Sequence, residues 1–293
     1  ILYHIISCGK ITIKYCLLSI ISFKYINKYI IIEHNYLPDK MTIDFVPVIM
    51  AGGMGKRMKS ELPKVLHNFM GEPMLVRIIK TTLLSNPINV VIIVGIFREI
   101  ITSTLRKYLS EKEFSTLILV DQVDPQGTGH AVQCALPILS SICYNHTNIV
   151  VLSGDVPLIS SEMIDDMRMI DSNVALAITE MATPTGYGRI VIDDRKQFSR
   201  IVEQKDCSEE EKKINIINCG LYMFSFQELS RYLPLLTNNN AQKEYYLTDL
   251  FYMLIRDNVK TKVVEISMDK QYQLQGVNTP EQLSELEKIA EGE

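Results

Sequence analysis

The sequence predicts an α/β protein whose mainly parallel sheet carries helices on both faces. Two observations lead to this fold class. Short apolar runs rich in valine and isoleucine, such as residues 89–94, alternate with longer segments suited to helices, and this alternation is typical of parallel sheets. The composition, 47% hydrophobic and 22% charged over 293 residues, is that of a globular chain long enough for one large domain or two small ones.

The first half of this pattern follows Met41. Each expected strand is a continuous apolar run, which is typical of strands buried on both faces. These strands are residues 46–50, 89–94, 117–120 and 149–152. The helices expected between them are residues 74–84, 99–109, 129–139 and 161–170. Ligands of open α/β sheets bind at the carboxyl ends of the strands, so the first candidates for a functional site are residues 51–58, 121–130 and 154–158.

The second half is looser and forms a smaller β-rich part. Strands are expected at residues 174–179, 188–192 and 216–226, and the charged stretch 205–213 is expected to be a solvated loop or a short helix. A last helix is expected from residue 280 to about 290. There Thr279 is placed to cap the helix, Pro280 takes the first helical position, and Gln282 completes a capping box.

Residues 1–40 differ from the rest in composition. They are crowded with Ile, Tyr, Lys and Asn, and their acidic residues are Glu33 and Asp39. Their apolar stretch, residues 15–23, is shorter than the roughly 20 residues that a membrane-spanning helix needs, and no cleavage site of a signal peptide follows it. We hypothesise that translation starts at Met41, that residues 1–40 are not part of the fold, and that residues 41–293 form one domain that does not enter a membrane.

Net charge and cysteine spacing narrow the class of function. The formal net charge is −4, so the basic footprint of a nucleic-acid-binding protein is missing. A local group of Lys, Arg and metal ions can still bind a small anion. None of the six cysteines forms a C-x-x-C pair, which gives no zinc signature. We expect reduced thiols and a cytoplasmic protein.

The glycine-rich turn after the first expected strand is a candidate phosphate-binding site. It reads M-A-G-G-M-G-K-R-M over residues 50–58. Its glycines let backbone N–H groups approach an anion closely, and Arg57 and Lys64 supply the positive charge that a polyphosphate needs. The turn matches neither the P-loop nor the dinucleotide fingerprint. The alternative is a tight strand-to-helix turn with two surface basic residues.

Two further strand ends carry small and polar residues. Q-G-T-G-H-A over residues 126–131 precedes an expected helix; it either binds a ligand or places Thr128 as an ordinary helix cap. S-G-D-V-P-L over residues 153–158 places Asp155 where it can hold Mg²⁺, which takes one or two protein oxygens. The alternative is a turn in which Asp155 bonds to its own backbone. Weaker polar groups follow at residues 186–190, 203–206, 218–220, 240–249 and 276–279.

Taken in order, these segments closely resemble the uridylyltransferase domain of the bifunctional N-acetylglucosamine-1-phosphate uridyltransferase/glucosamine-1-phosphate acetyltransferase family. The resemblance runs from about residue 46 to residue 290, and P-K-V-L-H at residues 63–67 and Q-K-E-Y-Y-L-T-D at residues 242–249 are especially specific. It implies a Rossmann-like nucleotidyltransferase fold, Mg²⁺ as cofactor, and UTP and N-acetylglucosamine 1-phosphate as substrates. The implied products are pyrophosphate and UDP-N-acetylglucosamine, a cell-envelope precursor.

The resemblance also implies roles for individual residues. Arg57 and Lys64 are similar to the basic pair that acts on the phosphates, and Asp155 and Asn278 resemble the Mg²⁺ ligands. The residues that look like the nucleotide-binding set are Ala51, Gly52, Gly53, Gln122, Gly127 and Thr128. The residues that look like the sugar-binding set are Gly188, Glu203 and Asn218.

The sequence departs from the family pattern in three ways. M-A-G-G replaces the common L-A-A-G at residues 50–53, and Cys219 replaces the usual threonine. The hexapeptide repeats of the acetyltransferase domain are absent from the sequence, so acetyltransferase activity is not expected of this chain and the oligomeric state stays open. Two alternatives are a nucleotidylyltransferase for another base or hexose, with Gln122 and Glu203 as discriminating positions, and a non-catalytic sugar-nucleotide sensor.

Overall fold

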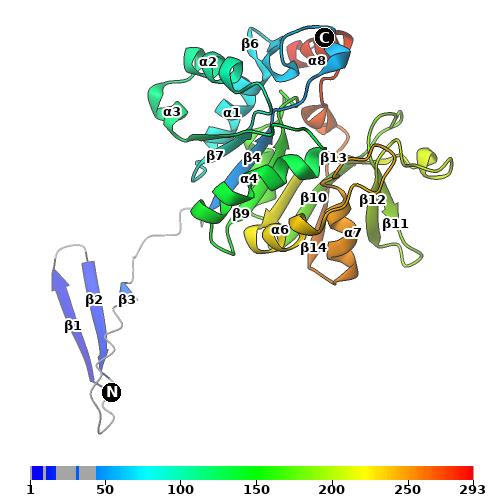
Figure 1. The fold of residues 1–293 in the computed structure, drawn as a ribbon. Coiled ribbons are helices and arrows are strands. Elements are labelled where there is room, and N and C mark those ends of the chain that lie inside the picture. The colour runs from blue at the N-terminus through cyan, green and yellow to red at the C-terminus, as the bar shows by residue number, and fades with distance from the viewer. Residues whose placement is uncertain (1, 9–10, 18–30, 33–43, 293) are drawn as a thin grey trace. The chain divides into compact units, whose positions relative to one another are not determined.

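The computed structural model describes residues 2–8, 11–17, 31–32 and 44–292 (Figure 1). Contacts within the chain divide it into two units, Ile1–Thr42 and Ile43–Glu293. In the first unit, β1 (Leu2–Cys8), β2 (Ile11–Leu17) and β3 (Ile31–Ile32) pair in that order as an antiparallel sheet. Met41 lies outside the described residues, so the expected translation start stays a prediction.

The second unit is built on a nine-stranded sheet. Its strand order is β12–β11–β13–β9–β4–β7–β8, and β10 pairs with β13 and β14. The strands are β4 (Phe45–Met50), β7 (Val90–Ile93), β8 (Leu117–Val120), β9 (Asn148–Ser153), β10 (Val174–Glu180), β11 (Arg189–Ile192), β12 (Phe198–Val202), β13 (Ile216–Ser225) and β14 (Thr261–Glu265). Strands β9, β4, β7 and β8 run parallel, whereas β13 pairs antiparallel with β9, β10 and β11. The predicted α/β class is confirmed, and the antiparallel half is the β-rich part.

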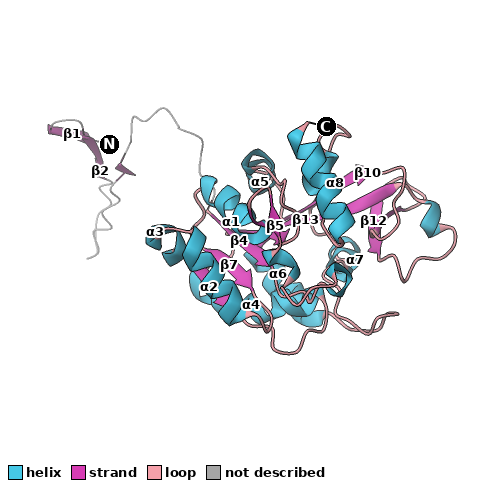
Figure 2. Cartoon of the chain, turned by 90° about the horizontal axis from the view of Figure 1, so that it is seen from above, coloured by secondary structure: helices cyan, strands magenta, loops and turns pink. Residues whose placement is uncertain are grey.

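Helices cover both faces of this sheet. The helices that contribute to one apolar core are α1 (Met74–Leu84), α2 (Arg98–Tyr108) and α5 (Ser161–Arg168). Those of the second core are α4 (Thr128–Ile142), α6 (Phe226–Tyr232) and α7 (Asp249–Arg256). Figure 2 shows α1 and α5 on one side of β4 and β7, and α4 on the other. No helix within the described ranges is both long and apolar enough to cross a lipid bilayer.

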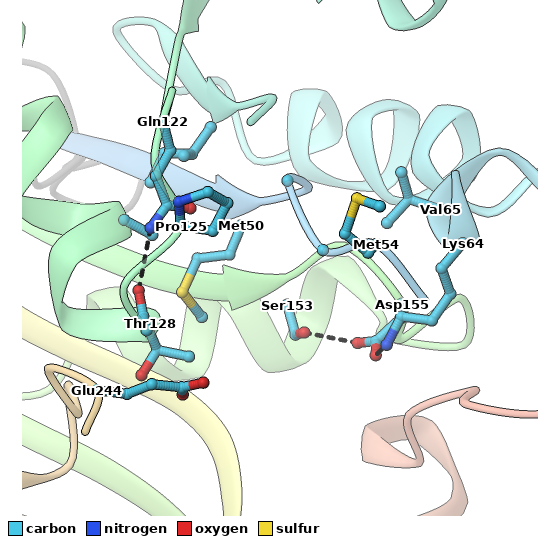
Figure 3. Close-up of a pocket in the computed structure, with 15 residues that line it drawn as sticks. Met50, Met54, Lys64, Val65, Gln122, Pro125, Thr128, Ser153, Asp155 and Glu244 are labelled. Carbon is cyan, nitrogen blue, oxygen red and sulfur yellow. Dashed lines mark hydrogen bonds and ion pairs between the residues drawn. The ribbon is translucent and has the colours of Figure 1, made fainter. Parts of the chain in front are cut away.

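A third, smaller core lies beside α8 (Pro280–Glu291), which contributes Leu286 to it. The remaining short elements are α3 (Glu111–Ser115), β5 (Asn68–Phe69), β6 (Glu72–Pro73) and the 3-10 turns Lys56–Met58, Lys64–Leu66, Glu211–Lys213, Leu233–Leu235 and Gln271–Leu274. The turn Lys64–Leu66 belongs to the segment that brings Lys64 to the edge of the sheet (Figure 3).

The strands of the parallel half are buried on both faces because their side chains alternate between the two larger cores. In β4, Phe45 and Ile49 join the core that contains α1, whereas Val46 and Val48 join the core that contains α4. Each of these side chains is at most 1% exposed. Successive strand residues point to opposite faces, so a strand covered on both faces needs an unbroken apolar run. This unbroken apolar run is the pattern from which the sequence predicts a strand buried on both faces.

The predicted elements match the parallel half closely and the antiparallel half in part. Strand β8 and helix α1 have the predicted bounds, and the others of the parallel half differ by one to three residues at an end. Strands β10, β11 and β13 confirm predicted strands, and the stretch 205–213 is a loop that ends in a 3-10 turn. The sequence does not predict β12 and β14, which carry charged side chains such as Arg200 and Lys262, nor does it predict α6 and α7.

The start of α8 confirms the predicted cap and corrects the predicted capping box. Thr279 Oγ1 accepts the Gln282 N–H at 3.2 Å, and Pro280 follows as the first helical residue. The capping box is wrong in one contact, because Gln282 Oε1 accepts the Asn278 N–H at 2.8 Å, one residue before the cap. This hydrogen bond ties the backbone of Asn278 to the first turn of α8.

Candidate active site

A pocket of about 280 Å³ opens at the carboxyl edge of the parallel strands. The segments that follow β4, β8 and β9 line it, and this is the edge at which open α/β sheets bind ligands. The predicted site residues that line the pocket are Gly52, Gly53, Lys64, Gln122, Gly127, Thr128 and Asp155. Lys64 and Asp155 lie at one end of this pocket, and Gln122 and Thr128 lie at the other (Figure 3).

The glycine turn carries the chain from β4 to the pocket. Ala51 is buried and extends the strand, because it donates its N–H to the Ile93 carbonyl at 2.8 Å. A Cβ at Gly52 would lie 2.8 Å from the Gly95 nitrogen, so glycine fits here without displacing the neighbouring backbone. The close contact between Gly52 and Gly95 accounts for the second glycine of M-A-G-G. Gly53 lines the pocket and has open space where a Cβ would stand, so its backbone is accessible to a ligand.

Two cationic side chains and two oxygen donors meet at one end of the pocket. Lys64 Nζ donates to Asp155 Oδ2 and, at 3.1 Å, to Asn278 Oδ1. Arg57 Nη2 donates to the same Asn278 oxygen at 2.9 Å. The side chains of Lys64 and Asp155 are 15% and 11% exposed, so salt screens this pair less than it screens a surface pair. The structure therefore brings together all four residues that the resemblance assigns to phosphate chemistry and metal binding.

The Asp155 carboxylate is fixed from a second side. Ser153 Oγ, at the end of β9, donates to Asp155 Oδ1 at 2.5 Å. The Asp155 carbonyl accepts the Val277 N–H at 2.9 Å, and this bond holds the segment before α8 against the end of β9. The carboxylate thus bonds to side chains from other positions, and Asp155 is buried. The alternative of a turn aspartate that only bonds to its own backbone is wrong.

The two oxygen donors fit a small divalent cation. Asp155 Oδ2 and Asn278 Oδ1 share one ammonium group, that of Lys64, so both oxygens lie within contact of a single positive charge. Carboxylate and amide oxygens are suitable ligands for Mg²⁺, which typically binds through one or two protein oxygens and completes its shell with water and substrate phosphates.

The other end of the pocket is formed by the turn before α4. Gly127, not Thr128, is the residue before this helix, and Thr128 Oγ1 accepts the Leu247 N–H at 3.1 Å. The alternative that Thr128 is an ordinary helix cap is therefore wrong. Gln122 is 5% exposed, and its Nε2 donates to the Gly127 carbonyl at 3.1 Å. Gly127 has a φ of 105°, and a Cβ there would lie 2.6 Å from the Tyr245 carbonyl oxygen, so glycine is required.

The three residues predicted to bind the sugar meet in the antiparallel half. The Asn218 N–H donates to the Gly188 carbonyl at 2.9 Å, and a Cβ at Gly188 would lie 3.6 Å from Glu203 Oε2. Thr248 Oγ1 donates to Glu203 Oε1 at 2.8 Å. Burial is the largest cause that raises the pKa of Glu203, and nearby carboxylates add to it. The group offers carboxylate and amide oxygens for hydrogen bonds to hydroxyl groups.

Four neighbours of these residues have no role assigned from the sequence: Ser153, Tyr187, Glu244 and Thr248. Burial raises the pKa of Tyr187, and the negative charge of Asp155 adds to this rise. Glu244 lines the pocket. Each of the four lies in a segment that the sequence indicates as a candidate site. Their position in these segments is the sequence signal that could have identified them.

Comparisons with known proteins give consistent matches. Residues 46–269 match a family described as nucleotidyl transferase. A "Probable UDP-N-acetylglucosamine pyrophosphorylase" of Acanthamoeba polyphaga mimivirus is 37% identical over 249 residues, which cover 83% of this chain and 94% of that protein. A "Bifunctional protein GlmU" of Neisseria gonorrhoeae is 38% identical over 247 residues, which cover 84% of this chain and 51% of that protein. The chain thus spans about half the length of the bifunctional relative.

A solved structure shares the fold at lower identity. A chain from Bacillus anthracis, described as a "Putative Glucose-1-Phosphate Thymidylyltransferase" in complex with a sucrose, superposes with a TM-score of 0.64 at 18% identity. The match covers 84% of this chain and 95% of that chain. It confirms the predicted nucleotidyltransferase fold.

Proposed function

The chain belongs to the nucleotidyl transferase family, and we propose that it transfers the uridylyl group of UTP to N-acetylglucosamine 1-phosphate. The products are UDP-N-acetylglucosamine and pyrophosphate. The observation that carries the proposal is the convergence of Arg57, Lys64, Asp155 and Asn278 at one end of a pocket that Gln122 lines at the other. The names of the relatives at 37% and 38% identity support the choice of substrates.

In this proposal UTP lies along the pocket. Its base and ribose occupy the end formed by Gln122, Gly127 and Thr128, and its phosphates extend past the turn at Ala51–Gly53 toward Lys64. The accessible backbone at Gly53 supports this placement, because exposed N–H groups of a glycine turn bind anions.

Asp155 and Asn278 would hold Mg²⁺ through one oxygen each. When bound, the metal supplies positive charge that stabilises the phosphates during transfer. Ser153 orients the Asp155 carboxylate through its hydrogen bond to Oδ1, and Gln282 fixes the backbone of Asn278. These contacts leave Asp155 Oδ2 and Asn278 Oδ1 directed at the same cation, which in the free protein is the ammonium of Lys64.

The transfer itself needs positioning and charge more than proton removal. A phosphate oxygen of the sugar phosphate attacks the α-phosphorus in line, a new P–O bond forms, and the bond to the pyrophosphate oxygen breaks. Phosphate monoesters have a second pKa of about 6, so the nucleophile is already ionised near pH 7 and no general base is required. Lys64 and Arg57 meet the charge that builds on the leaving pyrophosphate.

The sugar would occupy the group formed by Gly188, Glu203 and Asn218. Glu203 accepts hydrogen bonds from sugar hydroxyls, and Thr248 holds it in place. A residue larger than glycine at position 188 would bring its Cβ to 3.6 Å from Glu203 Oε2, so the absence of a side chain leaves that carboxylate oxygen accessible. Tyr187 directly precedes Gly188, and burial and then the negative charge of Asp155 raise its pKa.

Pyrophosphate release tests the proposal. Purified protein is given Mg²⁺, one nucleoside triphosphate and one sugar 1-phosphate from a panel that includes UTP, CTP, dTTP and ATP with N-acetylglucosamine, glucose and galactose 1-phosphates. We expect the highest kcat/KM for UTP with N-acetylglucosamine 1-phosphate. A clear preference for another pair contradicts the substrates and favours a nucleotidylyltransferase of other specificity. Nucleotide binding without pyrophosphate release from any pair points to a sensor.

The cysteines support the cytoplasm as the working compartment. Cys134, Cys143, Cys207 and Cys219, which lie within the described ranges, are free thiols. Burial raises the pKa of Cys143 to about 11 and that of Cys219 to about 12, so both remain protonated. Free thiols are typical of proteins in a reducing compartment.

A further inference from the structure

His130 contacts the base end of the pocket without lining it. It lies in the first turn of α4, and its Nδ1 is 3.2 Å from Nε2 of Gln122, which does line the pocket. The proposed chemistry gives His130 no task, because neither a proton transfer nor a phosphate contact reaches this position. Its effect must therefore pass through Gln122.

The Gly127 carbonyl decides which way the Gln122 amide faces. This carbonyl accepts the Gln122 Nε2 donor at 3.1 Å and also the Ala131 N–H of α4 at 3.1 Å. The surrounding backbone is pinned, because Gly129 donates its N–H to the Tyr245 carbonyl at 2.7 Å. A carbonyl oxygen only accepts, so a reversed amide would set two acceptors against each other. The amide nitrogen must point toward Gly127.

His130 takes the second proton of the same amide nitrogen. An amide nitrogen carries two protons, and the one that Gly127 does not accept points toward His130 Nδ1. Nδ1 must then be the acceptor, which leaves Nε2 as the ring nitrogen that donates. That nitrogen lies 3.8 Å from Cys134 Sγ, one turn further along α4, and the thiol sulfur is a weak acceptor.

We infer that His130 is a positioning residue that selects the nucleobase by occupying the second amide proton of Gln122, so that the pocket meets only the Gln122 carbonyl oxygen. An exposed acceptor at this point favours a base whose ring nitrogen donates, as N3–H of uracil does. It rejects cytosine, whose N3 is an acceptor and would face Oε1 with no proton between them. The inference rests on the proposed function, which places the base beside Gln122.

The size of the effect follows from one hydrogen bond. A neutral hydrogen bond contributes about 0.5–1.5 kcal/mol, and an unpaired buried group costs more. A site that is built around such a bond rejects the ligand that lacks the partner. Without an acceptor at position 130, only the bond to Gly127 holds the amide plane, so the amide can rotate about the last side-chain torsion and offer its unpaired second proton to cytosine N3. Discrimination between UTP and CTP should then fall about tenfold.

Two substitutions at His130 distinguish the effect of its hydrogen-bond acceptor from the effect of the ring itself. His130→Leu removes the acceptor and keeps an apolar side chain, whereas His130→Asn keeps an acceptor, because Asn Oδ1 can take the place of Nδ1. The two variants and the unmodified protein are compared by kcat/KM for UTP and for CTP. Titration calorimetry with each nucleotide alone gives the same ratio without the sugar phosphate. Circular dichroism verifies the fold, and His130→Ala replaces the Leu variant if that variant does not fold.

The expected result is a UTP-to-CTP preference that falls about tenfold in the Leu or Ala variant and stays within about threefold of the unmodified protein in the Asn variant. An unmodified protein that binds UTP no more tightly than CTP overturns the proposed function along with the inference. An unmodified protein that discriminates, together with a Leu or Ala variant that discriminates equally well, overturns the role of His130 alone. An Asn variant as unselective as the Leu variant also overturns it.

Discussion

The ammonium of Lys64 occupies the proposed Mg²⁺ position, so this lysine should compete with metal binding. In the free protein it bonds to both Asp155 Oδ2 and Asn278 Oδ1. A divalent cation that binds these oxygens must first displace it, and the phosphates of the nucleotide then offer the ammonium a new partner. Metal binding should therefore be weak without nucleotide. The substitution Lys64→Met, which removes the charge and keeps most of the length, should reverse that.

The magnitude follows from the bond that the metal must break. A hydrogen bond to a charged group contributes about 1.5–3 kcal/mol, and the two side chains are only 15% and 11% exposed. Removing the competitor should therefore tighten metal binding to the free protein by about 10- to 150-fold. The same substitution removes charge stabilisation of the leaving pyrophosphate, so turnover should fall on the order of 10²–10³-fold. An unfolded variant would lose both metal binding and turnover. Tighter metal binding together with lower turnover therefore distinguishes the predicted effect from loss of the fold.

Mn²⁺ serves as the probe, because its electron paramagnetic resonance signal reports free metal directly. The titration is run without nucleotide on the unmodified protein, Lys64→Met and the matched control Lys262→Met, which removes an exposed lysine of β14. The control should behave as the unmodified protein does. Equal Mn²⁺ affinity in Lys64→Met and the unmodified protein would refute the reasoning that the ammonium holds the metal position. Near-normal pyrophosphate release in Lys64→Met would refute its assigned role.

Three further predictions concern the carboxylates Asp155, Glu203 and Asp249. Asp155→Asn keeps the size of the side chain and removes its charge, so pyrophosphate release should fall on the order of 10²–10³-fold and Mn²⁺ binding without nucleotide should be lost; retained binding contradicts the ligand role. Glu203→Gln should raise the KM for the sugar phosphate about tenfold, by weakening a charged hydrogen bond, and leave the KM for UTP unchanged; a shifted KM for UTP contradicts a sugar contact. Burial first, and then the charges of Glu203 and Asp206, raise the pKa of Asp249 to about 6 from 3.8. The folded state therefore binds this proton more tightly than the unfolded state does, and stability falls as pH rises from about 4 to about 6. Asp249→Asn should remove that fall, measured by urea unfolding at pH 4 and pH 7, and an unchanged pH dependence contradicts the assignment.

The parallel half could be predicted because local pattern and tertiary environment agree there. Residues 89–94 and 117–120 are apolar on both faces, and both faces of β7 and β8 meet helices. In the antiparallel half, local pattern and tertiary environment do not agree in this way. In β12 the sequence F-S-R-I-V mixes charge with apolar residues. Its pairing partner β11 decides its conformation, and pairing between distant segments cannot be read from local periodicity.

In the site, the charged residues could be predicted from the sequence, whereas the contacts that orient them could not. Charged residues in family motifs, such as Lys64 and Asp155, could be assigned because the resemblance supplies their chemistry. The contacts that orient those residues could not be predicted, because they depend on which side chains meet in the folded protein. Ser153 is an ordinary strand-end serine until its Oγ is found 2.5 Å from Asp155 Oδ1. Thr128 reads as a helix cap until Leu247, from a distant segment, proves to be its partner.

If the two substrates bind as proposed, strand β9 helps to fix the distance between them. It runs parallel to β4 and antiparallel to β13, so its carboxyl end lies where the nucleotide half of the sheet joins the sugar half. The pairing of Val151 with Tyr222 directs Asp155 and Asn218 to the same edge. In-line transfer requires the reacting atoms to be held about 3–3.5 Å apart. Because β9 pairs with strands of both halves, backbone hydrogen bonds fix the positions of Asp155 and Asn218 relative to each other.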